Sequence, residues 1–131
     1  MKQNFSVLCA LALASCIAVT QGQAAPENYE FRLVESEIKQ GDGATIAVTL
    51  VDKRTGKPVE NAVVFATRVD MAPDGMETMT SPVEAMPAGE PGVYRFKTNL
   101  VMAGGWRFSI AAKVQGETGT VESRLLLKAV E

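Results

Sequence analysis

The sequence predicts an all-β fold, because apolar and polar residues alternate with a period of two in one segment after another. Glycine and proline gather between these segments, where turns need a positive or a fixed φ. No segment repeats its apolar residues with a helical period. Strands at short spacing with turns between them predict an antiparallel, immunoglobulin-like β-sandwich of about seven strands, with a closed barrel as the alternative.

Six segments carry the strand pattern, and the best of them is 106–114. There we expect five inward side chains, namely Trp106, Phe108, Ile110, Ala112 and Val114. The other predicted strands cover residues 29–36, 45–52, 62–71, 92–98 and 120–130. The predicted turns cover residues 40–44, 53–58, 89–92, 102–105 and 115–119.

The first residues have the composition of an export signal. Lys2 precedes an uncharged apolar run that is short for a membrane span, and small residues follow it. We expect a signal peptide over residues 1–24, cleaved after Ala24 or after Ala25, and one mature domain over 25–131. In the alternative, "LASC" is a lipobox and Cys16 carries a lipid anchor.

The expected mature chain lacks the side chains on which many enzymes depend. Both cysteines, Cys9 and Cys16, lie in the predicted leader, and the chain has no histidine. The usual nucleophile–base pairs are therefore missing, and no disulfide can form. The mature chain would hold 12 basic and 15 acidic residues, a net charge of −3, without a basic block for nucleic acid. We expect a protein that is not an enzyme.

The methionines have an unusual distribution. Four of the six lie in "VDMAPDGMETMTSPVEAM", residues 69–86, and a fifth lies in "NLVMAGGW". Methionine normally fills gaps in a core, which suits Met71 at the end of a strand. Met76 and Met79 follow the turn signature "APDG", so we expect them to be exposed in a loop. Exposed thioethers are open to oxidation in an exported protein, so another role is needed.

Thioether sulfur is a soft, uncharged ligand that suits Cu(I) and, by extension, Ag(I). The candidate ligands are Met71, Met76, Met79 and Met102, and Met86 is the least certain. If residues 81–87 form a short strand, the loop of Met102 lies at the same end of the sandwich as Met71. If they are only a crossing loop, Met102 can lie elsewhere. Trp106 is either a core residue or a ring beside the bound cation.

Other readings of the same region remain open. The acids Asp70, Asp74 and Glu77 could hold calcium, although their spacing is not that of an EF-hand loop. Paired carboxylates in a cleft would indicate an enzyme. A methionine-rich loop is also an adaptable apolar surface, so a pure interaction module is the main alternative to metal binding. Its sheet edges could then pair with a partner strand.

Several separated elements resemble one family of exported bacterial domains, the YtkA-like / FixH-like family. They are Met71 with Pro73 and Met76, then Gly92 with Tyr94, and then Met102 with Gly104 and Trp106. The resemblance covers residues 41–121 and is strongest over 69–110.

The resemblance implies an immunoglobulin-type sandwich and a periplasmic accessory role in copper or heavy-metal handling. Its expected partners are components of resistance-nodulation-division efflux systems. Two features differ from members of the family: this chain has no histidine, and it has a leader in place of a membrane anchor. The expected function is therefore sequestration of Cu(I) or Ag(I), or its hand-over to an efflux system.

Overall fold

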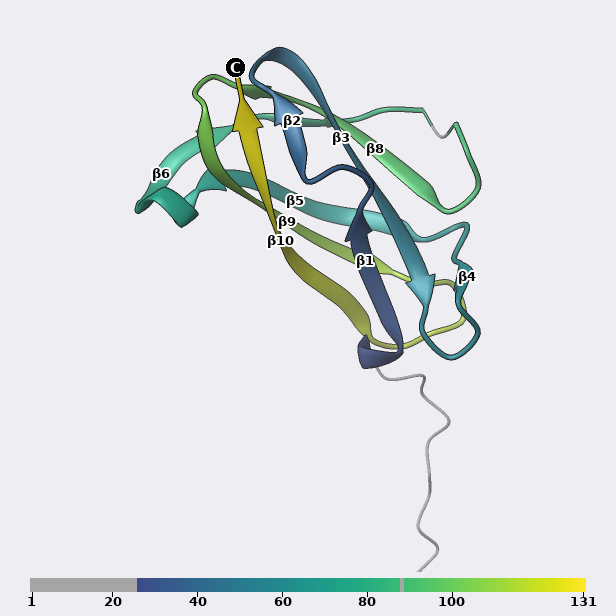
Figure 1. The fold of residues 1–131 in the computed structure, drawn as a ribbon. Coiled ribbons are helices and arrows are strands. Elements are labelled where there is room, and N and C mark those ends of the chain that lie inside the picture. The colour runs from purple at the N-terminus through teal and green to yellow at the C-terminus, as the bar shows by residue number, and fades with distance from the viewer. Residues whose placement is uncertain (1–25, 88) are drawn as a thin grey trace, which may run out of the picture.

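The computed structural model describes residues 26–87 and 89–131, which form two β-sheets packed face to face (Figure 1). The predicted β-sandwich is confirmed. The predicted signal peptide, both cleavage sites and Cys16 lie outside the described residues. Among the described residues, no helix is long and apolar enough to cross a membrane.

The first sheet has the order β1-β3-β8-β7, and β4 pairs with the C-terminal end of β3. Its strands are β1 (Tyr29–Leu33), β3 (Gly41–Asp52), β4 (Lys57–Pro58), β7 (Val83–Ala85) and β8 (Val93–Leu100). The second sheet has the order β2-β10-β9-β5-β6. Its strands are β2 (Glu37–Lys39), β5 (Val63–Met71), β6 (Met76–Ser81), β9 (Gly104–Lys113) and β10 (Thr120–Val130). Two short 3₁₀ turns accompany them, η1 (Pro26–Asn28) and η2 (Ala72–Asp74).

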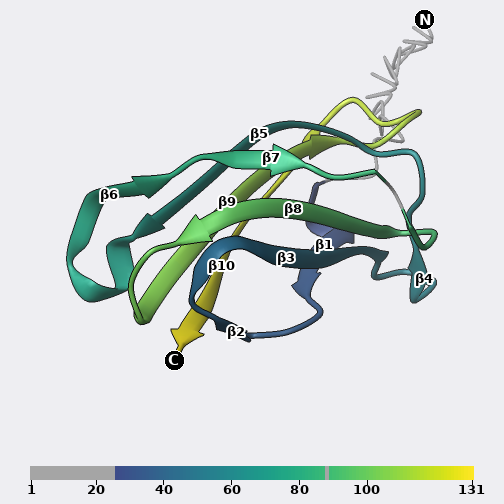
Figure 2. The same ribbon diagram turned by 90° about the horizontal axis from the view of Figure 1, so that it is seen from above.

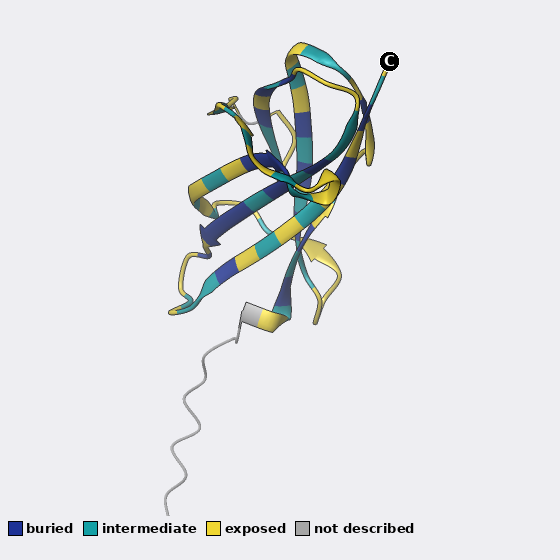
Figure 3. Ribbon diagram, turned by 90° about the vertical axis from the view of Figure 1, so that its left-hand side faces the viewer, coloured by how far each residue is buried: buried dark blue, intermediate teal, exposed yellow. Residues whose placement is uncertain are grey.

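The core lies between the sheets and follows the predicted alternation. The five residues predicted to face inward over 106–114 are all buried, four of them on β9 and Val114 directly after it, and Trp106 and Phe108 are inaccessible to water. From the facing sheet, Ile46, Val48 and Leu50 of β3 are also fully buried. Figure 3 shows this change between buried and exposed residues along the strands. The alternation in the sequence therefore arises from one core-facing side on each sheet.

The chain passes from one sheet to the other between β6 and β7, and the sequence pattern predicted this crossing only in part. β6 pairs with the end of β5 in the second sheet, and β7 then pairs with β8 in the first. Pro82 lies between them and removes a backbone donor at the crossing point. The prediction that Met76 and Met79 lie in an exposed loop is wrong, because both belong to β6 and are half-buried against the core.

Two further details differ from the prediction. Residues 40–44 were expected to be a turn, but β3 already begins at Gly41 and its register with β8 shifts between Gly41 and Ala44. Gly43, with φ +72°, supplies the left-handed backbone at this irregularity. The short strand β2 was not predicted, and its pairing with β10 is parallel, in an otherwise antiparallel set of pairs. Its only buried residue is Ile38, too little to give a pattern.

Candidate metal site

The end of the sandwich that carries β6 brings two of the methionines together. β5 ends at Met71, η2 turns the chain, and β6 starts at Met76. The turn closes through Gly75, which has φ +75° and whose N–H donates to the carbonyl of Ala72. Met71 and Met76 are cross-strand partners next to a β-bulge. The "APDG" signature thus forms a tight turn that places two thioethers on neighbouring strands.

The turn between β8 and β9 reaches the same end, as Figure 2 shows. Its Met102 carbonyl accepts a hydrogen bond from Trp106 Nε1 at 3.0 Å. Two residues after Met102, Gly104 lies against Met71: a Cβ at this position would be 3.2 Å from Met71 Cε and would overlap Asp74 Oδ2. Because β7 is a strand, the condition for Met102 and Met71 to share one end is met. Glycine is needed here for close approach as well as for its φ of +137°.

The candidate ligands differ in their exposure to water. Met71 is fully buried, Met76 and Met79 are half-buried, and Met102 is 40% exposed. Met86 lies elsewhere: its N–H donates to the carbonyl of Arg95, and its sulfur accepts a 3.9 Å hydrogen bond from Thr45 Oγ1. Met71 and Met76 are therefore neighbours, and the turn that holds Met102 reaches the same end, whereas Met79 lies further along β6 and Met86 lies elsewhere.

Asp74 is held at the edge of this group. Its Oδ2 accepts a hydrogen bond from the N–H of Gly105 at 3.1 Å. The same carboxylate and the end of the Met71 side chain both occupy the space that a Cβ at Gly104 would need. One negative charge is thus fixed beside the methionines, where it would favour a cation. From the sequence, Asp74 was a candidate only for calcium or for a pair of carboxylates, and not for a site with the methionines.

The fully buried Asp70 is committed to structural contacts. Its Oδ2 accepts hydrogen bonds from Arg68 Nε at 2.9 Å and Arg107 Nη2 at 3.1 Å, and its Oδ1 accepts one from the N–H of Ala72. Burial alone raises the pKa of Asp70, but these bonds outweigh it, and the pKa lies below its ordinary value. Both oxygens of Asp70 are therefore already used as acceptors inside the protein.

Among residues 26–87 and 89–131, no three Asp, Glu, His or Cys side chains gather as a metal site. The calcium alternative through Asp70, Asp74 and Glu77 therefore has no support. Sequence reasoning also missed the contact of η2 with β9 through Gly104 and Gly105. The adjacent glycines were interpreted only as turn residues, although a glycine pair that starts a strand is also a signal of close backbone approach.

Fold and site together define a small β-sandwich domain with methionines at one end. The chain belongs to the YtkA-like family, whose model matches residues 23–111. A search of curated proteins found no match. Among solved structures, the chain is similar to the Lin-41 filamin domain at 18% identity, with a TM-score of 0.47, covering 79% of this chain and 92% of that one. It is also similar to the ZirS C-terminal domain at 17% identity, with a TM-score of 0.45, covering 81% and 68%.

Proposed function

We propose that this chain is a non-catalytic periplasmic accessory protein that binds Cu(I) or Ag(I) through methionine thioethers. The observation that carries the proposal is the meeting of three chain segments at one end. Met71 and Met76 are cross-strand partners, and Gly104, next but one to Met102, is so close to Met71 that a Cβ there would be 3.2 Å from Met71 Cε. This arrangement supports a site in which methionines from β5, β6 and the β8–β9 turn would share one ion.

The donor chemistry fits a soft monovalent cargo. Thioether sulfur carries no charge and does not need to lose a proton, so binding would be insensitive to pH. The carboxylate of Asp74, fixed by Gly105, supplies a compensating negative charge close by. A set of neutral ligands holds the cation without a strong charge attraction, which suits hand-over better than storage. Membership of the YtkA-like family supports a role in metal handling, with a heavy-metal efflux system as the receiving partner.

The exposures suggest how the ion moves. Met71 lies inside the protein, whereas Met102 is at the surface. Met102 would capture the ion first, and its loop would present it to a partner. The hydrogen bond from Trp106 to the Met102 carbonyl keeps this loop in place for both steps. In this arrangement Trp106 acts as a buried core residue that positions the loop, since its ring is fully covered.

Silver provides the test, because Ag(I) does not change oxidation state in air. The folded chain is titrated with Ag(I) by calorimetry, alongside Met76→Leu, Met102→Leu and the matched control Met86→Leu. Leucine preserves volume at small structural cost. Met86 is 37% exposed and Met102 is 40%, so the control matches the variant in exposure.

The expected result is one Ag(I) per chain, with affinity lowered about tenfold or more by Met76→Leu and by Met102→Leu, and unchanged by Met86→Leu. Absence of binding, or an equal effect of all three variants, would contradict the proposal.

A second candidate function is a protein-contact surface at the same loop. Val101 is 54% exposed beside Met102, which makes a small apolar protrusion at the end of the sandwich. Met102→Leu separates the two functions, because leucine keeps the apolar surface and removes the sulfur. A partner that still binds the variant, while Ag(I) no longer does, would favour the contact surface.

A further inference from the structure

The outer face of the second sheet carries a hollow that the methionine site does not use. It has a volume of about 290 Å³ and lies over β5, β9 and β10. Three arginines line it, Arg68, Arg107 and Arg124, together with Ser109. The register explains this grouping: Arg68 and Arg124 are the two cross-strand partners of Ser109, and Arg107 is two residues before Ser109 on the same face.

Two of these arginines are held in place by Asp70, which is on the same strand as Arg68 and is the cross-strand partner of Arg107. The same oxygen of Asp70 accepts hydrogen bonds from Arg68 and from Arg107. Arg68 also donates from Nη2 to the carbonyl of Glu77 at 2.8 Å. Asp70 thus holds the two guanidinium groups in one arrangement, while its single charge neutralises only one of them. Preorganised guanidinium groups lose little entropy when they bind an anion.

Donors in the hollow are left without partners. Arg107 Nε is the one buried side-chain nitrogen or oxygen of the described residues that makes no hydrogen bond. Such a buried donor is costly unless something satisfies it. Arg124 forms no ion pair or side-chain hydrogen bond with any residue that the structure describes. The positive charge of Arg124 is therefore available to a ligand in the hollow, whereas the Arg107 Nε donor is covered by protein atoms.

We propose that this hollow binds a phosphate-type oxyanion. Guanidinium groups match the geometry of phosphate oxygens, and charge-assisted hydrogen bonds of this kind are strong. Arg124 supplies the unpaired charge, and the Ser109 hydroxyl lies between Arg68 and Arg124 on the neighbouring strands as a further donor.

The acid on the rim selects among oxyanions. Glu122 also lines the hollow, two residues before Arg124 on the same strand. An ionised carboxylate only accepts hydrogen bonds, so it favours an oxyanion that carries a proton. Inorganic phosphate near neutral pH still carries at least one proton, because its last proton is lost only at strongly alkaline pH, whereas sulfate carries none. Phosphate is therefore preferred over sulfate.

The test follows backbone amide shifts by NMR while inorganic phosphate or sulfate is added at constant ionic strength. The variants are Arg124→Gln and Glu122→Gln, both at exposed positions where the fold tolerates change. The matched control is Arg32→Gln, which removes one exposed arginine from the first sheet. Glycerol phosphate and vesicles containing phosphatidic acid serve as further arms to separate a free phosphate from a lipid headgroup.

We expect phosphate to shift amides of β9 and β10 with saturation, and Arg124→Gln to weaken binding about tenfold while Arg32→Gln does not. Glu122→Gln should remove the preference over sulfate. Binding to vesicles but not to the soluble phosphates would assign the site to a lipid headgroup. Equal losses in Arg124→Gln and Arg32→Gln, equal shifts by both anions in the native chain, or no saturable shift would overturn the proposal. None of these readouts depends on metal binding.

Discussion

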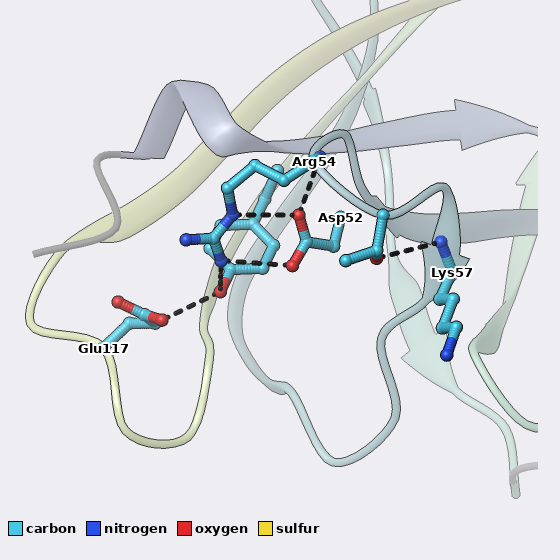
Figure 4. A network of polar contacts seen from close by, with 6 residues as sticks. Asp52, Arg54, Lys57 and Glu117 are labelled. Atoms are coloured by element: carbon cyan, nitrogen blue, oxygen red, sulfur yellow. Dashed lines mark hydrogen bonds and ion pairs between the residues drawn. The ribbon is translucent and has the colours of Figure 1, made fainter.

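Each end of the sandwich holds an aspartate that accepts hydrogen bonds from arginine, but only one of the two is shielded from water. At the methionine end, the Asp70 side chain is 0% exposed and shared by Arg68 and Arg107. At the other end, the Asp52 side chain is 17% exposed and pairs with Arg54. In Figure 4 Arg54 also donates to the hydroxyl of Tyr29.

Burial, more than the pairing itself, decides how much an ion pair contributes to stability. Both aspartates have a pKa below the ordinary value. For Asp52 the main cause is the hydrogen bond from Arg54, whereas Asp70 keeps a lowered pKa in spite of the opposing effect of burial. When an exposed ion pair is broken, water solvates the remaining charge. When a buried ion pair is broken, the remaining charge has no partner. Loss of the aspartate charge should therefore lower the free energy of unfolding more at the methionine end than at the other end.

The strongest test of this difference is Asp70→Asn. The amide keeps the shape but directs an N–H₂ group or a weaker acceptor at two guanidinium groups, one of them largely buried. We expect the free energy of unfolding to fall by about 3 kcal/mol in urea titrations. Asp52→Asn is the matched control at the opposite end, with a clearly smaller loss. Equal losses would mean that burial is not the deciding factor.

The same aspartate predicts the acid side of the stability curve. Because the folded pKa of Asp70 lies below the unfolded value near 3.8, its contribution is complete above that value and is lost as pH falls through the folded pKa. Urea midpoints measured from pH 7 down to pH 2 should fall less steeply below about pH 4 in Asp70→Asn than in the native chain. Parallel curves for the two proteins would show that Asp70 does not control this region.

Trp106→Phe tests how the methionine end is held. The ring is fully buried, so the smaller side chain leaves a void, and the Met102 carbonyl loses its hydrogen bond. We expect a loss of about 2 kcal/mol in the free energy of unfolding. Hydrogen exchange at residues 101–103 should rise more than exchange elsewhere. A uniform rise would show that the bond does not anchor the loop.

A smaller effect should distinguish close contact from backbone strain at Gly104. Gly104→Ala and Gly41→Ala impose similar strain, at φ +137° and +144°, but a Cβ meets Asp74 and Met71 only at Gly104. We expect Gly104→Ala to cost about 1 kcal/mol more than Gly41→Ala in urea titrations. It should also weaken Ag(I) binding, which Gly41→Ala should not. Equal stabilities would mean that Asp74 and Met71 move aside freely.

Much of the fold was predictable because the core requires a period of two on each strand. The alternation of Trp106, Phe108 and Ile110 with polar residues predicted β9, because all three side chains are buried in the core. β6 was missed because its exposed edge and the bulge beside Met71 interrupt the alternation. β2 was missed because it buries one side chain, and its partner β10 lies some ninety residues away in the sequence.

The candidate ligands could be named from the sequence, but the side chains that each residue of the site contacts could not. Soft ligands can be counted in a sequence, and Met71 at a strand end pointed to one end of the sandwich. Asp70 was a possible metal ligand from the sequence, but in the structure it is a buried acceptor. One of its donors is Arg107 on β9, thirty-seven residues away in the sequence. Such pairing depends on strand order, which periodicity does not encode.

The least effect is expected at the exposed end, from Tyr29→Phe. The hydroxyl donates to Glu117 Oε1 at 2.9 Å and accepts from Arg54, and it joins the β3–β4 turn to the β9–β10 turn (Figure 4). Burial, followed by the hydrogen bond to Glu117, raises the pKa of Tyr29, so the hydroxyl remains protonated as a donor at neutral pH. Phenylalanine keeps the ring in the core and under Arg54, whose guanidinium carbon is 5.6 Å from the ring centre. The free energy of unfolding should therefore fall by only about 0.5–1 kcal/mol in urea. A loss as large as that of Asp70→Asn would show that this network is as important as the buried one, and would remove the contrast between the two ends.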